Sequence, residues 1–326
     1  MIQRRISIVC VVIVAISTMA TSCSKHKAAS PATHPDLIAA AKARLGALST
    51  GIATGDAALA SSLSSGDVAT EDQASARRIG GQITSGDTID YAFDILSVKT
   101  YPLNGGGSDF IAFENGRGHS GGGVFREVEI YHRGTPSSSW KATARSYFND
   151  NIELPELKLD TKGSGQLLND VAQLSDVANR YASAMNDGSI SGKLAVGTFA
   201  PSQATTGAIT SAAEFLGTNS VHGTASVHWS PRPGGQAVAL TEGVLVFASV
   251  QETKTIHEGV EGTKFYFVIQ DAKRLVYGGL LPPGDYGDIS QELLVSIAVV
   301  VSPKGWDVVG QNATLTTIDG IPYRHP

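Results

Sequence analysis

Cysteine is almost missing from this 326-residue chain, which has only Cys10 and Cys23. Both lie near the N-terminus, so disulfides, zinc–thiolate sites and cysteine nucleophiles are excluded from the residues that follow. Clusters of positive charge are missing too, since the net charge is −5 and no run of Lys or Arg stands out. Nucleic-acid binding needs a basic stripe, and we therefore exclude it.

Long apolar runs are also scarce. The N-terminal run, residues 6–16, is too short to cross a bilayer as a permanent helix, and Arg4 and Arg5 precede it. A basic start followed by a short apolar run predicts a secretory signal peptide over residues 1–22.

The end of this segment, Ala20-Thr21-Ser22-Cys23, resembles the lipobox of bacterial lipoproteins. In that motif the cysteine receives diacylglycerol and becomes the new N-terminus, although the position of Ala20 more often holds Leu. The resemblance implies acylation of Cys23. We therefore expect a protein that is lipid-anchored to the extracytoplasmic face of the cell membrane.

The composition after the signal is that of folded protein, because the chain is 42% hydrophobic and 17% charged. The length suggests two domains. We expect a flexible tether over residues 23–35, a first domain over 36–153, a linker over 154–166 and a second domain over 167–322.

Hydrophobic periodicity predicts an α+β fold in which helices precede antiparallel strands in each half. In the first half we expect helices over 36–45 and 57–63, the second after Gly55-Asp56, and strands over 90–98, 109–113 and 124–131. In the second half we expect helices over 167–185 and 210–215, and strands over 224–229, 237–250, 263–269 and 293–301.

Both halves end in the same way, with a hairpin turn, a tryptophan and a strand. The turn at 135–139 precedes Trp140, and the turn at 302–305 precedes Trp306. We interpret the halves as an internal duplication in which each tryptophan fills the gap between a curved sheet and its helix.

Helix-then-sheet halves of this kind resemble the nuclear-transport-factor-like or cystatin-like α+β units. The layout also resembles a group of actinobacterial lipoproteins known only as a domain of unknown function. The resemblance depends on the lipobox, on segment 55–59, on Trp140, and on the Leu154-Pro155-Glu156-Leu157 bridge with the helix after it. It implies display at the cell surface and no particular reaction.

One short motif suggests catalysis. Gly118-His119-Ser120-Gly121-Gly122 fits the G-x-S-x-G pattern of serine hydrolases, and residues 116–121 also fit G-x-G-x-x-G. Both motifs require a helix directly after the glycine-rich turn, but an alternating segment typical of a strand follows here. A glycine-rich hairpin loop is therefore the favoured interpretation, and a hydrolase using Ser120 is the alternative.

Metal sites are not expected, and neither are cofactors. His222 and His228 are too far apart along a strand to share an ion. His119 and His132 have no carboxylate at ligand spacing. Glu127 and Glu129 share one strand face, which we interpret as a solvated face, although one desolvated carboxyl would make an acid–base pair.

Two further segments suggest contacts. Residues 293–301 are apolar on both faces, which predicts a strand buried between the domains, or else an exposed patch for association. Residues 279–286 form a stiff loop in which Tyr286 looks exposed. We expect a non-enzymatic protein that binds an envelope protein or a small apolar ligand; a purely structural envelope protein is a further alternative.

Overall fold

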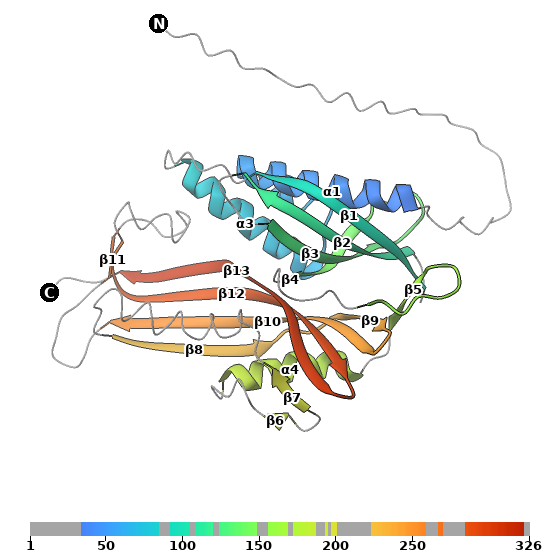
Figure 1. Ribbon diagram of the computed structural model, residues 1–326. Helices are drawn as coiled ribbons and strands as arrows, with labels where there is room; N and C mark the ends of the chain where they lie inside the picture. The colour runs from blue at the N-terminus through green and yellow to red at the C-terminus, as the bar shows by residue number, and fades with distance from the viewer. Residues whose placement is uncertain are drawn as a thin grey trace, which may run out of the picture. The chain divides into compact units, whose positions relative to one another are not determined.

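The computed structural model describes residues 34–84, 92–104, 108–119, 124–148, 156–168, 172–186, 193–194, 197–200, 223–258, 267–269 and 284–322. Residues from Ala32 to Pro326 form one compact unit. It is an α+β fold that combines a large, mostly antiparallel sheet with few helices (Figure 1). None of the helices in the described ranges is both long and apolar enough to cross a membrane.

The described residues begin with three helices, α1 (His34–Thr54), α2 (Ala57–Ala60) and α3 (Gly66–Thr84). The helix predicted from Asp36 is confirmed and extends further than expected. The short helix is confirmed as well, because the Asp56 side chain accepts a hydrogen bond from the Leu59 N–H at 3.0 Å and caps α2. Helices α1 and α3 approach closely at Gly55, whose φ is +71°, and a Cβ there would lie 2.5 Å from the Gly80 Cα.

Four antiparallel strands follow: β1 (Phe93–Asn104), β2 (Ser108–Gly118), β3 (Val124–Arg133) and β4 (Lys141–Phe148). The three predicted strands of the first half are therefore confirmed. Each extends beyond its predicted C-terminal end, because backbone pairing with its neighbours continues past the apolar alternation.

In the second half, the described residues form helix α4 (Ala172–Asn186) and nine strands. The strands are β5 (Gly165–Leu168), β6 (Lys193–Leu194), β7 (Gly197–Ala200), β8 (Gly223–Pro231), β9 (Gln236–Leu240), β10 (Gly243–Glu258), β11 (Phe267–Ile269), β12 (Gly284–Ser302) and β13 (Gly305–Pro322).

Two predictions in this half are wrong in detail. Leu167 and Leu168 belong to strand β5 instead of the helix, because they pair with Val238 and Ala237 of β9. The strand expected over 237–250 is a hairpin of β9 and β10, which turns at residues 241–242 before Gly243, with φ +107°. Local apolar periodicity does not distinguish these cases, since tertiary pairing decides them. The helix expected over 210–215 lies outside the described residues.

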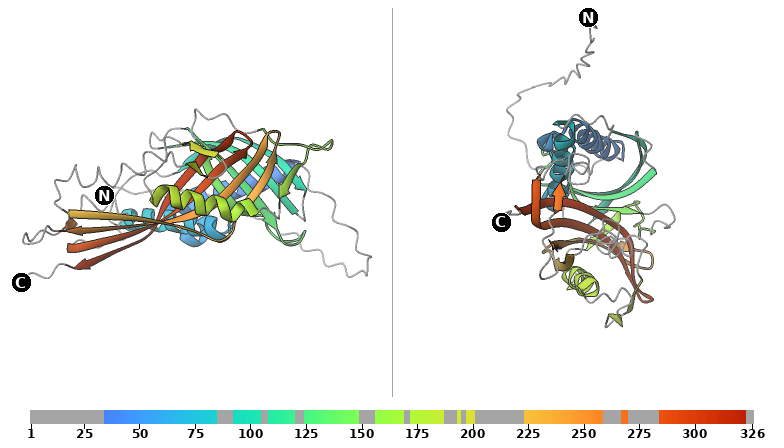
Figure 2. Two further views of the ribbon diagram at one scale, coloured as in Figure 1. Left: turned by 90° about the horizontal axis from the view of Figure 1, so that it is seen from below. Right: turned by 90° about the vertical axis from the view of Figure 1, so that its left-hand side faces the viewer.

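Strand pairing crosses from one half of the chain to the other. It runs β1–β2–β3–β4–β13–β12–β10–β9–β5 and returns to β1, which makes a closed circuit (Figures 1 and 2). Apolar side chains from both halves pack together inside it, among them Ile111, Ile130, Leu245 and Phe247. The space enclosed by the strands is therefore a filled core.

Strand β12 is covered on both faces, as the sequence predicted. Val295, Ile297 and Val299 pack in one core with helix α4, while Ala298 lies in the core inside the circuit. Helices α1 and α3 lie on the opposite side of β12 from α4 (Figure 2). An association patch on this strand is thus excluded, since residues 294–299 are buried.

The two tryptophans fill gaps beside helices, as expected. Trp306 is 4% exposed and packs in the α4 core, with the Arg180 guanidinium 4.7 Å from the ring centre. Trp140 packs against the α1-facing core, its ring edge-on to Phe110. The prediction for Tyr286 is wrong. It belongs to β12 and is buried, because pairing with Phe267 of β11 extends the sheet over the expected loop.

Candidate functional site

A layer of charged side chains lies between helices α1 and α3 and the sheet of β2, β3 and β4. It contains five carboxyl groups and two guanidinium groups, all at most 4% exposed: Arg44, Glu71, Asp72, Glu114, Glu127, Glu129 and Arg145. Charges are rarely buried so completely in a protein, and therefore this layer is the most informative chemical feature of the fold.

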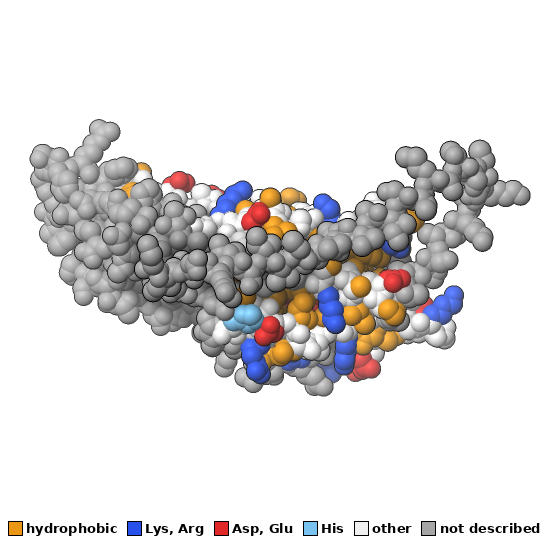
Figure 3. Space-filling model, turned by 90° about the horizontal axis from the view of Figure 1, so that it is seen from above, with side chains coloured by type: hydrophobic (Ala, Val, Ile, Leu, Met, Phe, Trp, Pro, Cys, Tyr) orange, Lys and Arg blue, Asp and Glu red, His pale blue; other side chains and the backbone are white. Residues whose placement is uncertain are grey.

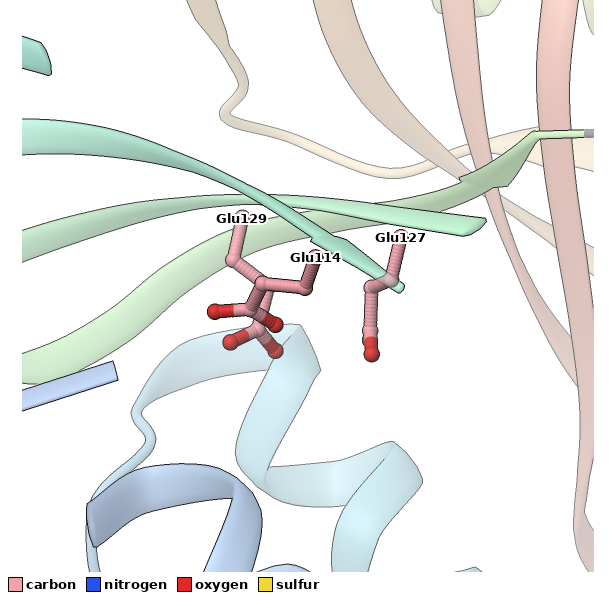
Figure 4. Close-up of side chains that lie close together, drawn as sticks. All are labelled: Glu114, Glu127 and Glu129. Atoms are coloured by element: carbon pink, nitrogen blue, oxygen red, sulfur yellow. The ribbon is translucent and has the colours of Figure 1, made fainter. Parts of the chain in front are cut away.

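The strand register brings three of these carboxyl groups together. Glu114 of β2 lies directly opposite Glu127 of β3, and Glu129 follows two residues later on the same face. Figure 4 shows the three side chains extending from the strands toward the helices. One carboxylate oxygen from each residue can be chosen such that all three lie within 4.8 Å of one another.

Arg44 joins helix α1 to this cluster. Its Nη2 donates to Glu129 Oε1 at 2.9 Å and lies 3.0 Å from Asp72 Oδ2 of α3. The other two nitrogens of Arg44, Nε and Nη1, have no hydrogen-bond partner. One guanidinium thus holds a helix-to-sheet contact and a helix-to-helix contact together.

Arg145 of β4 holds the other end of the layer. Its Nη1 donates to Asp72 Oδ1 at 2.7 Å, and its Nε donates to Glu71 Oε2 at 3.1 Å. Glu71 also accepts hydrogen bonds from the Ser296 hydroxyl of β12 and, at 3.3 Å, from Asn312 Nδ2 of β13. Helix α3 is therefore fixed to strands of both halves by one carboxylate.

Tyr131 lies between two carboxyl groups. Its hydroxyl donates to Glu114 Oε1 at 3.0 Å and also contacts Glu129 Oε2. A phenol has a single hydrogen to donate, so both contacts are satisfied together only when one carboxyl group carries a proton.

Burial sets the protonation of the cluster. Desolvation, followed by repulsion from Glu129, raises the pKa of Glu127 to about 8. The same two causes raise the pKa of Glu114 well above its ordinary value, and desolvation raises the pKa of Glu71. Burial thus favours the uncharged, protonated form of both Glu127 and Glu114.

The interpretation of Glu127 and Glu129 as residues of a solvated face is wrong, because α1 and α3 cover that face. The two glutamates are 1% and 0% exposed. The sequence analysis also missed the five other charged residues of the layer. The available signal was weak: Arg44 interrupts an Ala-rich helix, and Glu71 and Asp72 lie in α3, which was not predicted.

Two histidines have carboxylate partners that their sequence spacing did not reveal. His132 Nδ1 lies 2.7 Å from Asp109 Oδ1, directly across the β2–β3 ladder, and His119 Nε2 lies 2.9 Å from Asp94 Oδ1. Among the described residues, neither histidine belongs to a group of three possible metal ligands. His228 is an exposed residue of β8, and His222 lies outside the described residues.

The remaining predicted sites, Cys23 and Ser120, also lie outside the described residues. The strands on either side of Ser120 are described: β2 ends at Gly118, β3 begins at Val124, and the two are antiparallel neighbours. A nucleophile elbow needs a strand followed directly by a helix, and these strands do not supply it.

Two small cavities reach Arg145. One has a volume of about 220 Å³ and is lined by Asp67, Thr143, Arg145 and Ser296 together with Phe247 and neighbouring residues. The other has a volume of about 150 Å³ and lies beside Asp72, Arg145, Tyr147 and Asn312. Polar groups of the charged layer thus line two depressions of the fold.

No protein-family model, no curated protein and no solved structure matches this chain.

Proposed function

We propose that this chain is an exported lipoprotein that acts by binding and not by catalysis. The N-terminal sequence supports export. It contains Arg4 and Arg5, the short apolar run over 6–16, and the lipobox-like ending at Cys23. In this proposal the folded unit is held at the extracytoplasmic face of the membrane by lipid on Cys23.

The observation that carries the binding role is the cavity of about 220 Å³ beside Arg145. It is small, and charged and hydroxyl groups line it, whereas the core inside the strand circuit is filled by apolar side chains. These features favour a small polar ligand or a polar side chain of an envelope protein over the apolar ligand expected from sequence.

An ion pair beside this cavity is suited to recognition. Arg232 Nη2 lies 2.8 Å from Asp67 Oδ1, and their side chains are 38% and 24% exposed. They are therefore reachable from solvent, while most of the charged layer is not.

Anchoring is tested by replacing Cys23 with alanine. Acylated protein is retained in the membrane fraction, and we expect Cys23→Ala to move it to the medium or the soluble fraction. Mass spectrometry of the wild-type N-terminus should find a lipid-bearing Cys23. Membrane retention of Cys23→Ala, or an uncleaved and unmodified N-terminus, would contradict the anchor.

Binding at the cavity is tested by cross-linking in the cell envelope with Asp67→Lys as the variant. The matched control is Lys304→Glu, which changes an exposed pair with Glu242 on another part of the surface. A cross-linked species retained by wild type and control but lost by Asp67→Lys supports the proposal. Equal capture by all three proteins rules out this cavity.

The finer fold assignment belongs to the same proposal. Helices precede the strands in segment 36–153, and in segment 167–322 helix α4 precedes every described strand except β5, which supports two nuclear-transport-factor-like or cystatin-like units. Expression of segment 36–153 alone tests this. Cooperative unfolding of the isolated segment supports two units, whereas an unfolded product means that the strand pairing shared with the second half is essential.

A further inference from the structure

Several oxygens of the carboxyl cluster of Glu114, Glu127 and Glu129 have no hydrogen-bond donor, although two buried N–H groups of Arg44 in the same layer are also unpaired. Glu114 Oε2 and Glu127 Oε2 are buried and have no partner of any kind, and Glu127 Oε1 has only Arg145 Nε at 3.5 Å. Buried carboxylate oxygens are normally satisfied, since each orphan loses its hydration without replacement. The two orphan oxygens are therefore open to a further ligand.

The wider layer also lacks positive charge. Five carboxyl groups share the layer with the guanidinium groups of Arg44 and Arg145. Arg145 directs two of its nitrogens to Glu71 and Asp72, and Arg44 contacts Glu129 and Asp72. Glu114 has no guanidinium contact among the described residues. Glu114 and Glu127, where the orphan oxygens lie, therefore have the least contact with guanidinium groups, and without a cation only protons can neutralise them.

Three carboxylates with ligand atoms within 4.8 Å of one another match the needs of a hard cation. Up to six carboxylate oxygens are present, and the Tyr131 hydroxyl lies next to them. Each carboxylate oxygen has two lone pairs, so the oxygens that accept from Arg44 and Tyr131 retain one for a metal.

We propose that Glu114, Glu127 and Glu129 form a divalent-cation site whose preferred ion is Ca²⁺. Ca²⁺ takes six to eight oxygen ligands with variable geometry, whereas Mg²⁺ usually keeps several of its waters. This site is fully enclosed by side chains, which favours the ion that accepts an all-protein ligand set.

Two cavities lie near the cluster. The cavities of about 220 and 150 Å³ both border Arg145, and Arg145 lies beside Glu127. The proposal depends on the geometry of these strands alone and is independent of the lipid anchor.

Calorimetric titration of the detergent-purified full chain, stripped of metal by a chelator, tests the site. Addition of CaCl₂ should show one binding site, with a dissociation constant of about 10⁻³ M or tighter, as extracellular calcium modules have. Glu127→Gln should weaken binding at least roughly tenfold, because it replaces a charged ligand by a neutral side chain of nearly the same shape.

The matched control is Glu252→Gln. Glu252 is 2% exposed and contacts Lys254 at 3.3 Å, and it lies on β10, outside the charged layer. This variant should bind Ca²⁺ as wild type does. Equal binding by Glu127→Gln and wild type would overturn the assignment, and so would the absence of binding by folded wild type up to about 10 mM Ca²⁺. If the protein binds Mg²⁺ or Mn²⁺ but does not bind Ca²⁺, the choice of ion is overturned.

A second measurement needs no variant and therefore does not depend on the folding of one. Tb³⁺ replaces Ca²⁺ in oxygen sites and emits when a nearby tyrosine is excited, and the Tyr131 hydroxyl touches this cluster. We expect sensitised Tb³⁺ emission from the wild-type protein that CaCl₂ reverses. If the folded protein gives no sensitised emission, or emission that CaCl₂ does not reduce, the cluster holds water or protons only.

Discussion

The same sheet is covered by helices in two chemically different ways. Helix α4 packs through Val177, Ala178 and Tyr181 onto apolar residues of the second half, including Val295. Helices α1 and α3 bury charge against the first half, although apolar patches around Leu37 and Leu48 flank the charged layer. Both interfaces consist mainly of buried side chains, but only the second depends on every partner being present.

The apolar and the charged interface should respond differently to substitution. Apolar packing tolerates small changes, because each lost group removes only its own contacts. A buried charge network fails abruptly when one partner is removed, since the remaining groups stay desolvated and unpaired. We therefore expect the α4 side to respond gradually to substitution and the α1/α3 side to respond sharply. On the face seen in Figure 3, the described residues mix acidic, basic and apolar side chains at the surface, whereas the charged layer is buried.

The largest expected effect is the loss of Arg145. Arg145→Met keeps an unbranched side chain but removes the guanidinium group and leaves Glu71 and Asp72 without their main partner. The free energy of unfolding should fall by about 3–5 kcal/mol, measured by urea denaturation. On the α4 side, Ile297→Val should cost only about 1 kcal/mol. Losses of equal size would remove the distinction between the two interfaces.

A smaller effect is expected from pH in chelator-treated protein. The pKa of Glu127 is about 8 in the folded state and has an ordinary value of 4.5, because burial disfavours its charge. The unfolded chain therefore binds fewer protons than the folded chain between these values, and stability must decrease as pH rises. The stabilisation is complete below pH 4.5 and is lost as pH rises through about 8.

We expect the free energy of unfolding to fall by roughly 2–4 kcal/mol between pH 5 and pH 9 because of Glu127. Urea denaturation across this range measures the slope. Glu127→Gln should flatten it, while Glu292→Gln, which changes an exposed carboxyl on β12, should not. A slope that Glu127→Gln leaves unchanged would show that this carboxyl group does not control the layer.

The smallest effect comes from one substitution made at both interfaces. Tyr131→Phe removes a hydroxyl that serves Glu114 and Glu129, and should cost about 1–3 kcal/mol because buried carboxyl groups lose their donor. Tyr181→Phe on α4 removes a contact of 3.3 Å with Gln311 and should cost about 0.5–1.5 kcal/mol. Thermal melting of the two variants measures the difference in their stability. A larger loss of stability for Tyr181→Phe than for Tyr131→Phe would reverse the comparison.

Much of the local structure was predictable from sequence. Alternating β-formers predicted β1 to β3, and Asp56 before an Ala-rich segment predicted the capped helix α2. These features depend on neighbours in the chain. The pairing of Leu167 with Val238 was not predictable in this way, because its partner is far along the sequence.

The sequence by itself determined that Glu127 and Glu129 share one face of a strand, because side chains alternate across a sheet. Only the tertiary structure decided what covers that face. The partner of Glu129 is Arg44, 85 residues away, and the partners of Arg145 on α3 are more than 70 residues away. Periodicity reports which side chains point together, while burial and pKa depend on the distant segments that pack over them.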